Sequence, residues 1–224
     1  MLHLGRMILE LILVALGAYL IGSIPFGLLL TKAAGLGDIR TIGSGNIGAT
    51  NVLRTGNKKL AALTLLLDGF KGFAPVYVLS FFFLQQDPRN AYTDCIPGPC
   101  YPPATDPRIL SITLIAVILG HCFPIWLKFK GGKGVATALG ATIGLSPFIG
   151  LGACLSWLLT ALLFRISSLS ALVAMLTLPG FAWYLDMPSY IFPLAIITTF
   201  VFYRHKDNIK RLLAGTEPKI GQKK

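Results

Sequence analysis

The stretch VATALGATIGLSPFIGLGACLSWLLTALLF, residues 135–164, decides how many times this chain can cross a bilayer. It contains no charged residue, and a proline lies near its middle. Because proline cannot donate the backbone hydrogen bond of a helix interior, two structures are possible. One is a long helix kinked at Pro147, and the other is two short helices that turn at Ser146 and Pro147. The choice determines on which side of the membrane the C-terminus lies.

The rest of the sequence is typical of a membrane protein. Of the 224 residues, 54% are hydrophobic and 13% are charged, whereas soluble domains carry about 25% charged residues. Apolar runs recur, several of them near the roughly 20 residues that a membrane-spanning helix needs. The first run is too long for a cleaved signal peptide and lacks a cleavage site, so we expect it to be a span. The predicted spans are Met7–Leu30, Leu60–Leu84, Ile109–Leu127, Val135–Leu145, Phe148–Phe164, Ser168–Leu185 and Tyr190–Tyr203.

The distribution of charge favours seven spans. With two short helices in the deciding stretch, 16 of the 20 basic residues fall on one side of the membrane. One long helix would place the basic tail outside, against the cytoplasmic excess of Lys and Arg. We therefore predict an all-α integral membrane protein with seven transmembrane helices, N-terminus outside and C-terminus cytoplasmic. It forms a single domain, 1–224, with an external loop at 85–108 and a cytoplasmic tail at 204–224.

The four cysteines fit this topology. Cys122 and Cys154 fall in apolar spans, where a small buried hydrophobic residue is expected. Cys95 and Cys100 lie in the external loop, where an oxidising environment makes a disulfide plausible. A metal site is not indicated there, because two thiols without a nearby histidine are too few ligands.

A glycine-rich segment at residues 43–54 combines backbone freedom with neutral hydrogen-bonding groups. Its glycines allow main-chain amides to approach a ligand, and Arg54 offers a planar fork suited to phosphate or carboxylate. An ordinary flexible loop is the alternative interpretation. The side chains that we expect to contact a ligand are Ser44, Asn46, Thr50, Asn51 and Arg54.

A second glycine-rich turn, KFKGGKG at residues 128–134, leads into the apolar helix predicted from Val135. The first amides of a helix have no intrahelical partner, so the turn and helix predict an anion site with a full charge from Lys133. The spacing is not that of a Walker A motif. Lysines that only orient the protein are the alternative. The expected site residues are His121, Gly131, Gly132, Lys133, Gly134, Val135, Ala136 and Thr137.

Two charges lie inside a predicted span. Asp68 and Lys71 are three residues apart and therefore face each other on a helix. A charge at the centre of a bilayer costs about 2.5–3.5 kcal/mol or more, so we expect the two to pair or to reach a polar cavity. A structural ion pair and a functional role fit the sequence equally. The neighbouring Gly69 and Gly72 indicate close packing against another helix.

Further polar residues follow the fifth and seventh predicted spans. Arg204, His205 and Asn208 fall within one turn at the membrane surface if the last helix continues. Contact with anionic lipid explains the lysines of this segment but accounts less well for the histidine and asparagine. Ser168 and Ser170 either cap the sixth helix or contribute to the site.

Several kinds of chemistry are not indicated. There is no His–Asp acyltransferase pair, no G-x-S-x-G elbow and no His/Cys/Glu cluster, so neither a metal nor an organic cofactor is expected. The net positive charge is explained by the excess of Lys and Arg in the loops on one side of the membrane, so no nucleic acid partner is expected. Anion-binding groups remain, and they predict a phosphate-handling site beside spans that can admit a lipid chain. A transporter for a phosphorylated solute is the leading alternative.

The chain resembles the bacterial acyl-phosphate-dependent glycerol-3-phosphate acyltransferase family (PlsY), in motifs that cover nearly its full length. They are YLIGSIPFG (19–27), GSGNIGATNV (43–52), DGFKG (68–72), GHCFP (120–124), KFKGGKGVAT (128–137), RHKDNI (204–209) and GTEP (215–218). The resemblance implies seven spans in the bacterial inner membrane with an active site facing the cytoplasm. It also implies acyl transfer from acyl-phosphate to glycerol 3-phosphate, giving lysophosphatidate and inorganic phosphate.

The resemblance implies roles for particular residues. By resemblance, the glycine-rich turn with Lys133 binds the phosphate of the acyl donor. The implied contacts to glycerol 3-phosphate are Ser44, Arg54, Lys133, His205 and Asn208, joined by Ser168 or Ser170. Asp68, Lys71, His121 and Arg204 are expected to support substrate binding. Membrane lipids are the expected surroundings, and a monomer is compatible with the sequence.

Overall fold

The computed structural model describes residues 2–84 and 107–221, and the regular structure of these residues is helical. Short 3-10 turns lie at Ile39–Thr41, Leu53–Thr55 and Ile125–Leu127. The α-helices are α1 (Leu2–Gly22), α2 (Phe26–Ala33), α3 (Ala49–Val52), α4 (Lys58–Leu84), α5 (Pro107–Cys122), α6 (Val135–Leu145), α7 (Pro147–Phe164), α8 (Ser167–Tyr184), α9 (Pro188–Arg204) and α10 (Lys206–Leu213).

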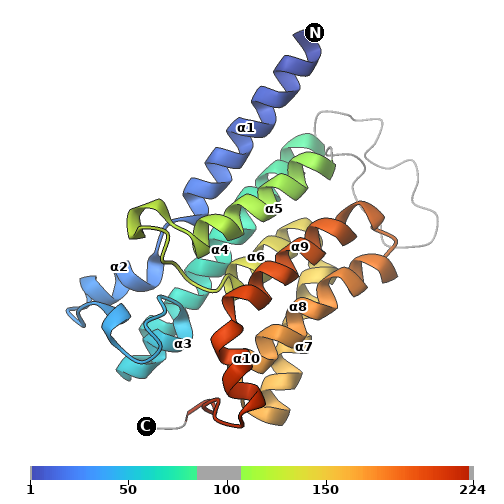
Figure 1. Cartoon of the computed structure of the whole chain (residues 1–224). Coiled ribbons are helices and arrows are strands. Elements are labelled where there is room, and N and C mark those ends of the chain that lie inside the picture. Colours follow the sequence, from blue (N-terminus) through green and yellow to red (C-terminus); the bar gives the residue numbers. More distant parts are fainter. Residues whose placement is uncertain (1, 85–106, 222–224) are drawn as a thin grey trace.

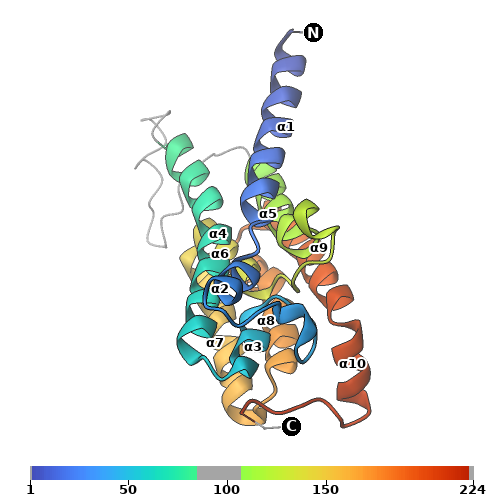
Figure 2. The same ribbon diagram turned by 90° about the vertical axis from the view of Figure 1, so that its left-hand side faces the viewer.

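The helices form an elongated bundle whose two ends differ in character (Figure 1). The N-terminus, the end of α4, the start of α5 and the α8–α9 turn lie towards one end. The short helices α2 and α3, the helix α10 and the C-terminus lie at the opposite end, and Figure 2 shows the same division from the side. Within the bundle, α4 packs against α6, α1 against α5, and α8 between α7 and α9. The polar segments predicted to carry chemistry therefore collect at one end.

The deciding stretch forms two helices. The backbone is extended at Ser146, with φ −151°, and Pro147 is the first residue of α7. Proline fits this position because the first turn of a helix needs no intrahelical N–H donor. A Cβ added to Gly150 would lie 2.4 Å from Ile143, so the two helices turn back closely on each other. The prediction of two short helices is confirmed.

Five helical segments are long and apolar enough to cross a membrane, by length and composition. They are Leu4–Ala33, Lys58–Phe81, Pro107–Leu127, Pro147–Phe164 and Ser167–Tyr184. The 11-residue α6 is about 17 Å long at 1.5 Å per residue, whereas the hydrocarbon core is about 30 Å thick. The remaining long helix, α9, has 17 residues. The chain is thus all-helical with five candidate spans among its described residues, and a count of seven depends on α6 and α9.

The first predicted span, Met7–Leu30, lies within the candidate span Leu4–Ala33, but its helix is interrupted. The α-helix stops at Gly22 and restarts at Phe26. Pro25 explains the break, since it disfavours helical geometry in the residue before it and removes a backbone donor. A smaller correction concerns the predicted loop at 85–108, because Pro107 and Arg108 already belong to α5.

The bundle is held by one large apolar core. Most of its residues come from α5, α6, α8 and α9, and α1, α4 and α7 also contribute. Its fully buried side chains include Leu114, Ile118, Met175, Leu178, Leu194 and Ile197. Cys122 belongs to this core and Cys154 is half-buried, both as free thiols, as expected for cysteines in apolar helices. Cys95 and Cys100 lie outside the described residues.

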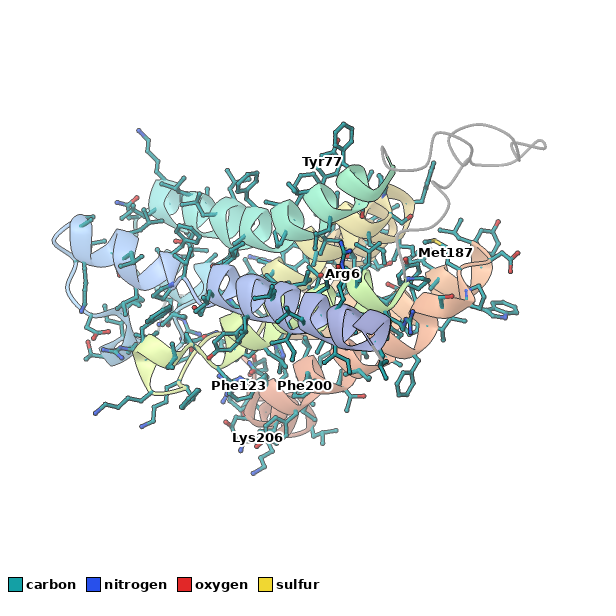
Figure 3. All side chains as sticks on the ribbon, turned by 90° about the horizontal axis from the view of Figure 1, so that it is seen from above. Arg6, Tyr77, Phe123, Met187, Phe200 and Lys206 are labelled. Carbon is teal, nitrogen blue, oxygen red and sulfur yellow. The ribbon has the colours of Figure 1, made fainter. Side chains whose placement is uncertain are left out.

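Helices α4 and α6 approach each other through glycines, as the sequence predicted for Gly69 and Gly72. A Cβ added to Gly140 would lie 1.9 Å from the carbonyl oxygen of Gly69, and one added to Gly72 would lie 2.1 Å from that of Thr137. Small residues allow two helix backbones to approach this closely inside a membrane. The outward side of α4 instead carries larger groups such as Tyr77, at the edge of the bundle opposite Lys206 (Figure 3).

Replacing Gly140 by alanine should destabilise the protein, because overpacking costs roughly 1–3 kcal/mol. We expect the melting temperature of the purified protein in detergent to fall by about 2–4 °C per kcal/mol. Gly180→Ala is the matched control in α8, where an added Cβ meets no atom within 4 Å. Equal melting temperatures for the two variants would show that the glycine contact between α4 and α6 is not tight.

Candidate functional site

The glycine-rich turn folds back on the end of α5. The N–H of Gly132 donates to the carbonyl of His121 at 3.0 Å, and the N–H of Gly131 donates to that of Cys122 at 3.1 Å. A Cβ added to Gly132 would lie 1.9 Å from Nε2 of His121, so the approach requires glycine. These two amides are therefore engaged within the protein. The first amides of α6, at 134–136, remain without an intrahelical partner by the geometry of the helix.

Arg204 holds the turn from the side of α9. Its Nε donates to the carbonyl of Gly132 at 3.0 Å, and its Nη2 donates to that of Gly131 at 2.8 Å. The guanidinium also lies 5.2 Å from the ring centre of Phe123. Arg204 and His205 stay adjacent, but α9 ends at Arg204 and α10 begins after His205, so the last helix does not continue unbroken. Arg204 is a residue that fixes the turn.

Lys133 is the centre of a polar network that joins three parts of the chain. Its Nζ donates to Oδ1 of Asn208. The amide nitrogen of Asn208 donates in turn to Oε1 of Glu217 at 2.5 Å. Glu217 also accepts from Ser168 at 2.7 Å and from Arg211 at 2.6 Å. The turn before α6, the start of α8 and the C-terminal segment therefore meet at one place.

The surroundings of this network shift two pKa values. Burial lowers the pKa of Lys133 to about 8, and the cations Arg211 and Arg204 act in the same direction, while Glu217 and Asp207 oppose them. Burial alone would raise the pKa of Glu217, but hydrogen bonds from Ser168, Asn208 and Arg211 outweigh it, so its pKa is lowered. Glu217 is thus an anion at neutral pH, and Lys133 is a cation that can lose its proton.

His205 is buried and uncharged near neutral pH. Burial lowers its pKa to about 4, and its Nδ1 lies 2.8 Å from the carbonyl oxygen of Val201. A carbonyl can only accept a hydrogen bond, so Nδ1 carries the proton and Nε2 carries a lone pair. In this form the free ring nitrogen is an acceptor, which suits a hydroxyl group better than a phosphate anion.

The loop at residues 43–54 is organised by Asn51. Its Oδ1 accepts from the main chain of Ser44 at 3.1 Å and from Arg54 at 3.4 Å, and its Nδ2 donates to the carbonyls of Ile39 and Ile42, each at 2.9 Å. Asn51 is only 2% exposed. It therefore shapes the loop, while the side chains of Ser44 and Arg54 lie at the surface.

The same loop is connected to the Lys133 network through the start of α8. The hydroxyls of Thr50 and Ser167 lie 3.4 Å apart, and the next residue, Ser168, contacts Glu217. Asn46 is half-buried beside Gly48. The structure thus brings the loop at 43–54 next to the predicted serine turn.

The two serines after α7 have different environments. Neither forms a side-chain cap on α8, whose N-cap residue is Ile166, so the capping interpretation is wrong. Ser170 donates to the carbonyl of Ile166 in its own helix at 2.9 Å. Ser168 is the one that joins the polar network.

Asp68, Lys71 and His121 lie beneath the glycine-rich turn and are buried. Lys71 pairs with Asp68 at 2.7 Å, as the sequence predicted for an ion pair, and Nδ1 of His121 lies 3.7 Å from the same carboxylate oxygen. All three are 4% exposed or less. Of the three, His121 contacts the back of the turn, at Gly131 and Gly132.

Sequence reasoning gave no role to Glu217 or Arg211. Glu217 was visible as one of few carboxylates among basic residues, within the GTEP motif, but only the folded tail brings it to Asn208. Arg211 lies in the basic segment for which we expected contact with anionic lipid. Among residues 2–84 and 107–221, no three His, Cys, Asp or Glu side chains gather as a metal ion would need.

The fold and this cluster define an all-helical integral membrane protein with a basic, hydrogen-bonding site at one end of its bundle. Residues 12–215 match the family described as "Glycerol-3-phosphate acyltransferase". The chain is 48% identical to a glycerol-3-phosphate acyltransferase of Erythrobacter litoralis over 93% of this chain and 94% of that protein. It is 49% identical to one of Paramagnetospirillum magneticum over 96% of each.

Solved structures agree with the sequence comparison. Crystal structures of PlsY (YgiH), an integral membrane glycerol 3-phosphate acyltransferase, are similar in a glycerol 3-phosphate form and a lysophosphatidic acid form. The first has a TM-score of 0.79 and 35% identity, covering 94% of this chain and 96% of that one. The second has a TM-score of 0.77 and 34% identity, with coverage of 94% and 95%. The chain belongs to the glycerol-3-phosphate acyltransferase family and is a PlsY-type membrane acyltransferase.

The lowered pKa of Lys133 predicts an alkaline limit to activity. Its folded pKa of about 8 lies below the ordinary 10.5, so the cation is lost as the pH rises through about 8. Since kcat/KM reports the free enzyme, we expect kcat/KM to fall roughly tenfold between pH 7 and pH 9.

Lys133→Arg is the control for this limit, because arginine stays charged over the whole range. Relative to its own value at pH 7, the variant should keep its kcat/KM at pH 9. An equal alkaline fall in both proteins would assign the limit to another group.

Proposed function

We propose that this protein transfers a fatty acyl group from acyl-phosphate to the 1-hydroxyl of sn-glycerol 3-phosphate, giving lysophosphatidate and inorganic phosphate in phospholipid synthesis. The observation that carries the proposal is the contact of Lys133 with Asn208 at the open N-terminus of α6, because this geometry suits a phosphate group. The names of the similar structures, which mention glycerol 3-phosphate and lysophosphatidic acid, support the acceptor and product.

The two phosphates are proposed to occupy neighbouring positions. Lys133 and the amides at 134–136 hold the phosphate of the donor, with Thr137 completing the first turn of α6. Ser44, Arg54, Asn208 and His205 contact glycerol 3-phosphate, together with Ser168. Asn46 and Thr50 line the same loop. Other residues are proposed to fix the backbone of the site without contacting substrate, because their hydrogen bonds are made within the protein. They are Asn51, Gly131, Gly132 and Arg204.

The proposed chemistry needs alignment more than a protein nucleophile. Acyl-phosphate is a mixed anhydride, and its phosphate is already a good leaving group. The acceptor's 1-oxygen adds to the acyl carbon, the bond from that carbon to the phosphate oxygen breaks, and phosphate departs. The hydroxyl proton goes to a phosphate oxygen of a substrate, while Nε2 of His205 accepts a hydrogen bond that orients the hydroxyl. Aligned reactants can supply about 7–11 kcal/mol of the barrier, and cations stabilise the developing charge.

The proposed topology has seven spans, with the N-terminus outside and the C-terminus in the cytoplasm of a bacterial cell with an inner membrane. It counts α6 and α9 as short crossings, which a locally thinned bilayer can accommodate. Placement of 16 of the 20 basic residues on one side supports this orientation. One domain would then cover 1–224, with 85–108 outside and 204–224 inside, and the active site would face the cytoplasm. We propose a monomer without cofactor or metal.

A transporter for a phosphorylated solute is not favoured. The curated relatives are acyltransferases. The polar side chains also gather at one end of the bundle, whereas transporters bind their substrate near the middle of the membrane.

Lys133→Ala should abolish phosphate release from acyl-phosphate and glycerol 3-phosphate, because the donor's phosphate loses its cation. The melting temperature should change little, since Lys133 is partly exposed. His205→Asn should keep part of the activity if His205 only orients the hydroxyl. Near-full turnover by Lys133→Ala would contradict the phosphate cradle. Acyl-CoA tested in parallel should not replace acyl-phosphate as donor.

The orientation can be tested with single cysteines in a variant whose native Cys95 and Cys100 are serine. A membrane-impermeant maleimide should label Lys206→Cys only after the inner membrane is permeabilised. The same reagent should label Pro107→Cys in intact spheroplasts. Labelling of Lys206→Cys in intact spheroplasts would overturn the cytoplasmic site.

A further inference from the structure

We propose that His121, held by the ion pair of Asp68 and Lys71, is a positioning residue that sets the place of the glycine-rich turn and so of Lys133. The inference rests on the proposed function for the role of Lys133 but concerns residues that do not touch substrate in this structure. It connects a buried charge network in the membrane to the chemistry at the end of the bundle.

The anchor of this arrangement is Lys71. Its Nζ lies 2.7 Å from Oδ1 of Asp68 and donates to the carbonyl oxygen of Ile24 at 2.7 Å. That carbonyl lies in the break between α1 and α2, where it also accepts from the N–H of Phe26 at 3.1 Å. One ammonium group therefore joins α4 to the break between α1 and α2. Both side chains are buried, so neither can leave the pair without leaving the other charge unpaired in the interior.

His121 lies between this ion pair and the glycine-rich turn. Its Nδ1 faces Oδ1 of Asp68 at 3.7 Å, which is a packing contact and too long for a hydrogen bond. The opposite edge of the ring lies against Gly132, where an added Cβ would come within 1.9 Å of Nε2. The carbonyl of His121 also accepts from the N–H of Gly132. The ring and the carbonyl of His121 thus both contact Gly132.

Arg204 closes the arrangement from the other side. It binds the carbonyls of Gly131 and Gly132, while their N–H groups bind the end of α5. The two glycines are held on both sides, and Lys133 is the next residue. A displacement of the turn would move Lys133 away from Asn208, and an error of about 1 Å in alignment can cost ~100-fold in rate.

A double-mutant cycle between His121→Ala and Gly132→Ala tests the contact. Each single variant should lower kcat/KM for acyl-phosphate by roughly 10–100-fold, with little change in KM for glycerol 3-phosphate. The double variant should be no worse than the poorer single variant, because removing the ring leaves room for the added methyl group. Fold-losses that multiply in the double variant would show independent effects and overturn the proposal, as would full activity in both single variants.

His121→Gln keeps a polar side chain of similar length, and it should recover most of the activity lost in His121→Ala. It also provides the test if the alanine variant does not fold. Thr160→Val is the control for stability alone, since it removes a buried hydrogen bond in α7 to the carbonyl of Ser156. This control should lower the melting temperature and leave kcat/KM unchanged.

Hydrogen exchange separates this proposal from the proposed function. In the wild-type protein the amides of Gly131 and Gly132 are hydrogen-bonded, so peptides covering 128–134 should exchange slowly. His121→Ala should accelerate their exchange whatever the acyl donor is, and unchanged exchange would overturn the positioning role. If the wild-type protein releases no phosphate from acyl-phosphate, only the assignment of the donor fails.

Discussion

Lys71 and Asp68 lie one turn apart on α4, among helices that leave them almost no contact with solvent. In such surroundings an ammonium group must satisfy its charge within the protein, and Lys71 does so with the carboxylate of Asp68 and with the carbonyl of Ile24 in the break between α1 and α2. The bend between α1 and α2, the position of α4 and the support behind the glycine-rich turn all depend on this arrangement. Glycines in α4 and α6 then allow the two helices to come close enough for the turn to reach it.

A second constraint is that backbone groups near a membrane must be paired or lie where they can meet a ligand or water. In the turn at 128–134 the glycine amides bind the end of α5, and the glycine carbonyls bind Arg204. Only the first amides of α6 are left by helix geometry to meet a ligand. Lys133 therefore lies between two glycines whose backbone groups are hydrogen-bonded within the protein and the first turn of α6, whose amides can bind a ligand.

The polar side chains at this end of the bundle are connected by hydrogen bonds through Glu217. Glu217 accepts hydrogen bonds from Ser168, Asn208 and Arg211, and this keeps the amide oxygen of Asn208 turned towards Lys133. His205 remains neutral because burial disfavours its cation. For the proposed acyl transfer between two phosphorylated substrates, such a site offers cations for the phosphates and a neutral acceptor for the hydroxyl. This division of tasks fits a reaction whose leaving group needs little further activation.

Local sequence alone determined the helical class, most helix boundaries, the spacing of Asp68 and Lys71 and the polar segments, while the distribution of charge along the whole chain decided for two short helices around Pro147. Apolar runs, proline and residue spacing act over a few turns, so they can be recognised without knowing which helices are neighbours. The tertiary structure decided what depends on distant contacts: the break after Gly22 held by Lys71, the engagement of the Gly131 and Gly132 amides, and the use of Ser168 instead of Ser170. It also decided the place of Glu217, since a tail residue reaches Asn208 and Ser168 only after α8 and α10 have packed.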